Sequence, residues 1–233
     1  MTEDTMHKSR TERTYNLLRD AIVHAHYAPG EKLRIDHIAK TMEASLGAVR
    51  EALSRLTAEG LVVAEPQKGF VVAPISRQDL LDMTEVRIEI ECRCLEDTIR
   101  RADLEWEGRI IALQHRLKVL AGRSMADGGL FSDQWHMAHT LFHDELTASC
   151  GNMWWLRLRR QLFTQSERYR RLSGPLDETG RDVTAEHDAI AAAAIARDID
   201  TARTAMAEHL RRTTTILLQS SLPFEDKPIP VDA

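Results

Sequence analysis

Four histidines have types and spacing that could support metal chemistry in this 233-residue chain. His139 and His143 stand four residues apart in a stretch with helical periodicity, so their side chains share one face of the helix. His187 and His209 each follow a glutamate in two later helical stretches. Neutral imidazoles from several helices of a bundle can bind one divalent ion. The spacing alone brings together only His139 and His143. The alternative to a metal site is that these histidines pack in the core or face solvent.

Arg87 is the candidate for binding an anion. It stands between Val86 and Ile88 in a largely apolar stretch, and its planar guanidinium can donate two parallel hydrogen bonds to a carboxylate. Glu91 follows one helical turn later, so a salt bridge within the helix is the alternative role. The expected chemistry is therefore either recognition of an organic acid or an internal ion pair.

A third set of residues has the chemistry of DNA recognition. The helix predicted over 45–59 has one apolar face, and its opposite face carries small and basic side chains: Ser45, Gly47, Arg50, Ser54 and Arg55. An arginine can bind guanine O6 and N7 or a phosphate, and a glycine lets the backbone approach closely. The pattern fits a helix that enters the major groove with its N-terminal residues first. A small helical domain with ordinary surface arginines is the alternative.

The elements that position this helix lie at the start of the chain. Five segments have helical or β periodicity: helices over 11–26, 36–42 and 45–59, then strands over 61–64 and 70–73. Three helices followed by a hairpin are the elements of a winged helix-turn-helix, which we predict for residues 11–75. Lys68 at the hairpin tip would reach a phosphate or the minor groove.

The rest of the chain has helical periodicity throughout. Six stretches are separated by glycine- and proline-containing breaks: 77–101, 104–122, 130–149, 153–172, 180–197 and 199–219. We therefore predict a mainly α protein in which an all-α bundle of residues 76–221 follows the winged helix-turn-helix. Residues 1–10 and 222–233 are expected to be flexible ends.

Composition narrows the class of protein. The net charge is -5, but residues 1–75 carry ten basic and ten acidic residues, so the acidic excess lies entirely in the second part. No apolar run in the sequence is long enough to span a bilayer, and we expect no export leader because no charged-then-apolar segment stands at its start. The three cysteines form no C-x-x-C pair, which argues against a disulfide framework or a thiolate zinc site. We expect a cytoplasmic protein without membrane partners.

Three segments of the N-terminal part are informative as a set: PGEKL at 29–33, IAKTMEASLGAVREALSRLTAEGLV at 38–62 and QKGFVVAP at 67–74. Together they resemble the GntR family of bacterial regulators over most of residues 11–74. Members usually carry Ser-Arg-Thr-Pro where this chain has Ser45-Leu-Gly-Ala48, so Leu46 replaces an arginine that often contacts a base. Leu46 would pack on a thymine methyl group instead, while Arg50 is retained. We predict DNA contacts at Arg34, Ser45, Leu46, Gly47, Arg50, Arg55, Lys68 and Gly69; for Arg34, a solvated cation is the alternative.

The helical part resembles the FCD ligand-binding domain of the FadR-type branch of this family. The matching pieces are EVR at 85–87 with Glu91, FH at 142–143, CGN at 150–152, EH at 186–187 and EHL at 208–210. The resemblance implies that three histidines and an aspartate hold a metal and that Arg87 binds the effector. This chain has His139 at the aspartate position. One negative charge is thereby lost, which favours zinc or nickel over harder ions.

These patterns predict a DNA-binding transcriptional regulator rather than an enzyme. A small mono- or dicarboxylate would bind the metal and Arg87, reorient the two DNA-binding domains of a homodimer and change affinity for a two-fold symmetric operator. A metal-dependent hydrolase with its active site in a helical bundle is the alternative. The segment His139-Thr-Leu-Phe-His143 lacks the glutamate of the His-Glu-x-x-His motif, which counts against that alternative.

Overall fold

The computed structural model describes residues 3–67, 69–126, 131–173, 181–220, 222 and 224. The chain forms two compact units. The first comprises residues 1–81 with 164–172 and 221–233, and the second comprises residues 82–163 and 173–220. The expected flexible tail of residues 222–233 lies, apart from two positions, outside the described residues.

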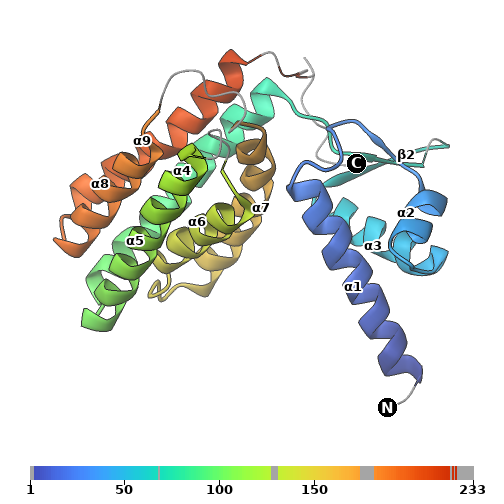
Figure 1. The fold of residues 1–233 in the computed structure, drawn as a ribbon, viewed down its shortest axis with the longest axis horizontal. Helices are drawn as coiled ribbons and strands as arrows, with labels where there is room; N and C mark the ends of the chain where they lie inside the picture. Colours follow the sequence, from blue (N-terminus) through green and yellow to red (C-terminus); the bar gives the residue numbers. More distant parts are fainter. Residues whose placement is uncertain are drawn as a thin grey trace. The chain divides into compact units, whose positions relative to one another are not determined.

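The N-terminal unit contains a winged helix-turn-helix, as predicted (Figure 1). Its elements are the helices α1 (Glu3–Val23), α2 (Ile35–Thr41) and α3 (Leu46–Ala58) and the strands β1 (Lys32–Leu33), β2 (Val62–Glu65) and β3 (Gly69–Val72). The antiparallel sheet has the order β1-β3-β2, with Val62 opposite Val72. The two-residue strand β1 was not predicted, and α1 begins at Glu3 instead of Thr11.

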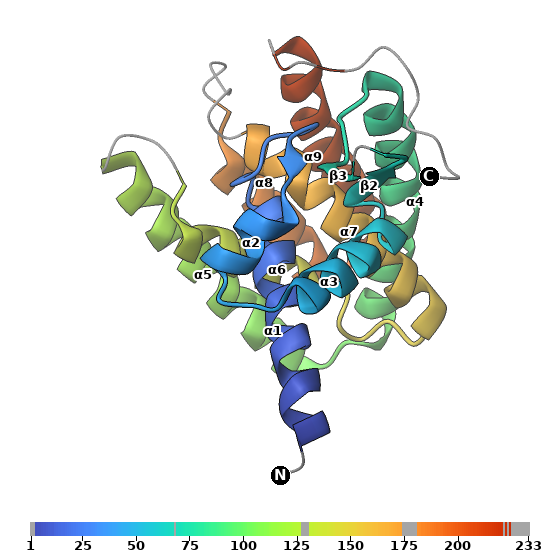
Figure 2. The same ribbon diagram turned by 90° about the vertical axis from the view of Figure 1, so that its right-hand side faces the viewer.

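The core of this unit explains why the three helices stay together. Leu18 and Ile22 of α1, Ile38 of α2 and Leu53 and Leu56 of α3 are all at most 1% exposed and form one apolar cluster. Helix α3 contacts both α1 and α2, and Figure 2 looks onto α2 and α3. Gly60 ends α3 with a positive φ of 72°, a conformation that glycine adopts without strain. Helix α3 is thereby held with one face on the core and the other exposed.

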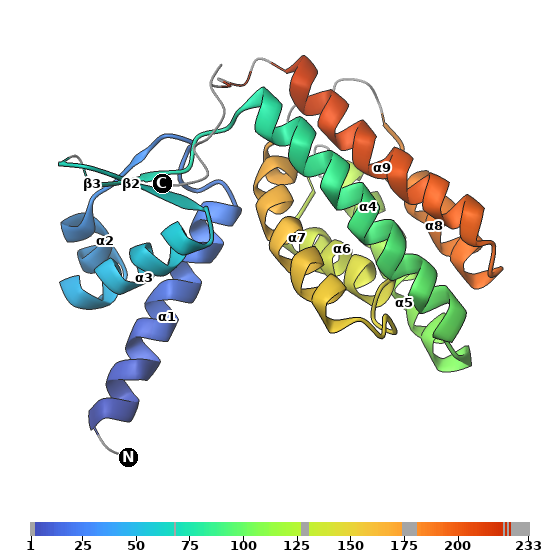
Figure 3. The same cartoon turned by 180° about the vertical axis from the view of Figure 1, so that it is seen from behind.

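The second unit is all-helical over its described residues. It contains most of α4 (Arg77–Arg101), the first half of α7 (Met153–Ser173), and the whole of α5 (Leu104–Ala126), α6 (Asp133–Glu145), α8 (Val183–Ile195) and α9 (Ile199–Gln219). Figure 3 shows α4, α5, α8 and α9 running side by side. Their contacts include a buried hydrogen bond of 2.7 Å between Thr84 and Thr214. None of the helices in the described part of the chain is long and apolar enough to cross a membrane.

Helix starts in this unit follow local capping chemistry. The side chains of Ser132, Asp182 and Asp198 each accept a hydrogen bond from a backbone N–H in the first turn of α6, α8 and α9. The core beneath them includes Trp106 and Phe142, both fully buried. Caps and core together fix the positions of the three helices that carry the four histidines.

Candidate metal centre and DNA-recognition helix

Helix α3 presents the predicted DNA-contacting residues at its N-terminus. The Ser45 hydroxyl caps the helix by accepting a hydrogen bond of 3.1 Å from the Ala48 N–H. Val49 is fully buried, which turns that side of the helix inward. Gly47 and Arg50 are exposed, and Leu46 is 49% exposed. The N-terminal turns of α3 are thus accessible to a DNA groove, with a leucine at the position where the resemblance expected an arginine.

The remaining predicted DNA contacts differ in their surroundings. Arg55 lies 3.7 Å from the centre of the Tyr15 ring and donates a hydrogen bond of 2.7 Å to Glu12, so its side chain ties α3 to α1. Arg34 is exposed and pairs with Asp36 at 3.3 Å. Gly69 opens β3 and is exposed. Lys68 lies outside the described residues.

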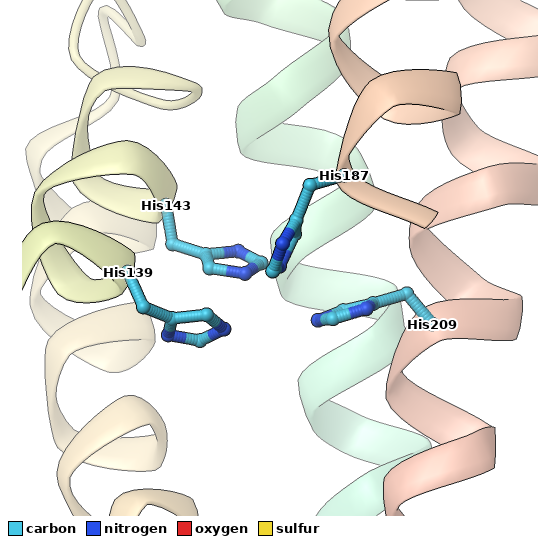
Figure 4. A group of neighbouring side chains, drawn as sticks. All are labelled: His139, His143, His187 and His209. Atoms are coloured by element: carbon cyan, nitrogen blue, oxygen red, sulfur yellow. The ribbon is translucent and has the colours of Figure 1, made fainter. Parts of the chain in front are cut away.

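The four histidines meet inside the helical unit (Figure 4). His139 and His143 come from α6, His187 from α8 and His209 from α9, and each is at most 4% exposed. One ring nitrogen from each lies within 4.8 Å of the others. Nitrogens bound to one zinc ion at about 2.1 Å lie about 3.4 Å apart in a tetrahedral site and at most about 4.2 Å apart on opposite sides of the ion. Side-chain rotations that bring the nitrogens closer by up to about an ångström would therefore seat one ion.

The buried environment favours the neutral form of two of these imidazoles, since it lowers the pKa values of His143 and His209. Burial, followed by the nearby charges of His209 and His187, lowers the pKa of His143 well below its ordinary value. Both ring nitrogens of His143 are buried without a hydrogen-bond partner among the described residues. A buried polar atom without a partner is costly, and a metal ion would satisfy it. The donor set therefore fits a divalent transition metal.

A buried glutamate of α4 and two buried arginines, one from α4 and one from α7, contact one another next to the helix that carries His143. Arg87 lies 3.5 Å from Glu91, whereas Arg159 donates a hydrogen bond of 2.8 Å to the same carboxylate. Arg87 lies near the imidazoles, because its guanidinium is 5.2 Å from the centre of the Phe163 ring and that ring is 6.3 Å from the His143 ring. Its charge contributes to lowering the pKa values of His143 and His209, after the larger effect of burial. The closer partner of Glu91 is thus Arg159, and the predicted internal salt bridge of Arg87 is the longer of the two contacts.

Arg159 is a site residue that the sequence did not reveal. Its side chain is only 6% exposed, and it donates hydrogen bonds of 2.7 Å to Asp144 and to the backbone oxygen of His143. It therefore links α7 to the helix that carries two of the four histidines. In the sequence it stands among other arginines of α7, such as Arg157 and Arg160, and nothing in the pattern marks the one that turns inward.

Glu186 was likewise missed. Its carboxylate accepts a hydrogen bond of 2.8 Å from Nδ1 of His209. Burial would raise the pKa of the Glu186 carboxyl, but hydrogen bonds from Arg181 and His209 hold it well below its ordinary value. A signal was present in the sequence, since glutamate precedes both His187 and His209, but it does not say which glutamate is buried.

A winged helix-turn-helix followed by an all-helical domain is the architecture of a DNA-binding transcription regulator. The family model for "Bacterial regulatory proteins, gntR family" matches residues 10–72, and the model for the FCD domain matches residues 82–212. The chain belongs to the GntR family of bacterial regulators and carries an FCD domain.

Individual proteins agree with this assignment. The chain is 36% identical to the uncharacterized HTH-type transcriptional regulator BphR of Paraburkholderia xenovorans, covering 92% of this chain and 88% of BphR. It is 34% identical to the HTH-type transcriptional repressor GlaR of Escherichia coli, covering 88% and 94% of the two chains. The fold resembles E. coli McbR/YncC, with a TM-score of 0.75, 19% identity and coverage of 90% and 97%. The chain is a DNA-binding transcription regulator, and the hydrolase alternative is not supported.

Proposed function

We propose that this regulator binds a two-fold symmetric operator as a homodimer and that a small carboxylate, bound at a metal centre, controls its DNA affinity. The ligands of the ion are His139, His143, His187 and His209. The observation that carries this proposal is the convergence of four buried imidazoles from three helices within 4.8 Å. A bound ion would supply open coordination positions for the carboxylate, and zinc or nickel suits an all-imidazole set.

The charges around the centre favour an anionic effector. Four neutral ligands leave both positive charges of a divalent ion uncompensated. Arg87 and Arg159 add positive charge on the side of α4 and α7, where Glu91 is the fully buried carboxylate that they share. Because an unbalanced charge in a buried site is costly, a carboxylate that reaches the ion and the Arg87 guanidinium would be bound tightly.

The DNA-binding half of the proposal depends on the exposed start of α3. Arg50 would contact a base edge or a phosphate, and Leu46 would pack on a thymine methyl group, so the preferred operator would differ from that of relatives with an arginine there. Ser45, Gly47 and Gly69 would let the backbone approach DNA, and Arg34 would contact phosphate. As in GlaR, which is named a repressor, binding would block transcription. A bacterial regulator of this kind would act in the cytoplasm.

One experiment tests both halves. Metal-free protein is prepared with a chelator and reloaded with zinc or nickel, and its thermal stability is measured with a panel of mono- and dicarboxylates. A true ligand raises the melting temperature by mass action. A gel shift on DNA upstream of the protein's own gene, at stated salt and with competitor DNA, then measures the effect of each hit on operator affinity.

Two outcomes would overturn the proposal. The metal centre is rejected if His187→Ala binds zinc as tightly as the unchanged chain. The regulatory mechanism is rejected if no carboxylate alters operator affinity although zinc is bound. We expect zinc binding to be lost in His187→Ala and the stabilising carboxylates to act only on the metal-loaded protein.

A further inference from the structure

Two candidate ligands of the metal centre are preceded by glutamates whose environments differ. In the pair Glu186-His187 the glutamate is 8% exposed, whereas in the pair Glu208-His209 it is exposed. The buried carboxylate contacts the histidine of the other pair. Oε2 of Glu186 lies 2.8 Å from Nδ1 of His209, so the glutamate on α8 contacts the histidine on α9. The first Glu-His pair therefore supports the imidazole of the second.

Two arginines hold the Glu186 carboxylate in place. Arg181 donates a hydrogen bond of 2.8 Å from Nε to Oε1 and a second one from Nη2 to Oε2. Arg212 donates one of 3.0 Å to Oε1. Arg181 is itself tied to α9 through Thr213 Oγ1 at 2.9 Å and the His209 backbone oxygen at 3.0 Å. The orientation of the carboxylate is thereby fixed before any ion binds.

The partners of Nδ1 decide the tautomer of His209. A carboxylate can only accept, so the contact with Glu186 requires a proton on Nδ1. Arg181 Nη2 also lies 3.3 Å from Nδ1 and could only donate to it, which would require the opposite tautomer. The contact with Glu186 is shorter, and Nη2 has two oxygen acceptors in Glu186 and the His209 backbone. The proton therefore belongs on Nδ1, and the lone pair belongs on Nε2.

We propose that Glu186 is a positioning residue that fixes the tautomer and ring orientation of His209, so that Nε2 faces the ion with its lone pair. Figure 4 shows the His209 ring extending toward the other three imidazoles. Its centre lies 4.7 Å from that of His187 and 5.2 Å from that of His143. Carboxylate partners of this kind raise the basicity of a metal-bound imidazole and hold it in place. The inference rests on the proposed metal centre and adds the residue that prepares one of its ligands.

The unchanged protein gives the first test. The chain is labelled with ¹⁵N-histidine, and the ring nitrogens are observed by NMR without metal and with zinc, with the His209→Gln spectrum assigning the signals. We expect a protonated Nδ1 in both states and a zinc-induced shift of Nε2. A proton on Nε2 in the metal-free protein, or zinc on Nδ1, would overturn the proposal. This measurement does not depend on whether a Glu186 variant folds.

Variants give the second test. Glu186→Gln keeps the shape of the side chain but removes its charge, and Glu208→Gln is the matched control in the other Glu-His pair. In competition with a chelator, zinc affinity should fall by about tenfold to 100-fold in Glu186→Gln and stay unchanged in Glu208→Gln. Equal zinc affinity in both variants would reject the role of Glu186. If His187→Ala also leaves zinc affinity unchanged, the proposed metal centre is rejected. If zinc affinity is lost in His187→Ala but kept in Glu186→Gln, only the role of Glu186 is rejected.

Discussion

Replacing Arg159 by methionine should destabilise the helical unit far more than removal of a surface arginine. Glu91 is fully buried, and Arg159 supplies its closest cation at 2.8 Å while also binding Asp144 and the His143 backbone oxygen. Removal of one partner of a buried pair leaves an uncompensated charge and costs about 3–5 kcal/mol. Because Arg87 stays 3.5 Å from Glu91, we expect a loss near the lower end, about 3 kcal/mol.

The chain offers a matched control and a specific probe. Arg100 pairs with Glu96 at 2.8 Å on the surface of α4, the helix that also carries Glu91, and the Arg100 side chain is 61% exposed. Arg100→Met should therefore cost no more than about 0.5 kcal/mol. All four tryptophans lie in the helical unit, at positions 106, 135, 154 and 155. Denaturant unfolding followed by tryptophan fluorescence, with chelator present, would thus report on that unit alone.

A triple substitution separates the buried charge from simple loss of packing. Glu91→Met combined with Arg159→Met and Arg87→Met removes the buried carboxylate together with both of its cations, and apolar replacement of buried ion pairs is often neutral or stabilising. The triple variant should be more stable than Arg159→Met alone. A loss below about 1 kcal/mol in Arg159→Met, or a triple variant less stable than the single one, would refute the reasoning that Glu91 depends on Arg159.

Three further predictions concern DNA and ligand binding. Arg50→Ala should weaken operator binding in a gel shift by about five- to 150-fold without changing the circular dichroism spectrum; unchanged affinity would remove Arg50 from the DNA interface. Arg87→Met should keep zinc affinity in a chelator competition but abolish stabilisation by carboxylates; a retained thermal shift would place the effector elsewhere. His139→Asp should still bind an ion but raise the affinity for manganese relative to zinc, because carboxylate oxygen is a harder ligand; an unchanged preference in competition titrations would contradict the charge argument.

The fold was largely predictable from local patterns. The period-3.6 stripe of α3, its Ser45 cap and the following Gly60 set both ends of that helix, and the structure agrees within one residue. The strand β1 has only two residues, too few for any periodicity, and it exists because β3 offers a free edge for pairing. The start of α1 at Glu3 was missed because polar residues there give no apolar stripe. Local sequence patterns thus predict the helices and strands that have a clear apolar periodicity or a capping residue.

The candidate site was less predictable because its parts are distant in sequence. The spacing of His139 and His143 predicted a shared face, but only the packing of α6 against α8 and α9 brings His187 and His209 to the same point. The family resemblance supplied that step. Arg55 looked like a DNA-contacting residue, yet its contact with Tyr15 depends on α1, which the pattern of α3 does not contain. A DNA contact at Arg55 stays a prediction.

The four-imidazole set changes what the bound carboxylate must do in the proposed function. An aspartate at position 139 would neutralise part of the charge of the ion. The neutral His139 does not, so the bound carboxylate effector would have to neutralise it. Burial makes the uncompensated charge costly, so ion and carboxylate stabilise each other. By linkage, the factor by which zinc tightens carboxylate binding equals the factor by which the carboxylate tightens zinc binding. A regulator built in this way responds to the metal and the organic acid together, because each is needed to balance the charge of the other.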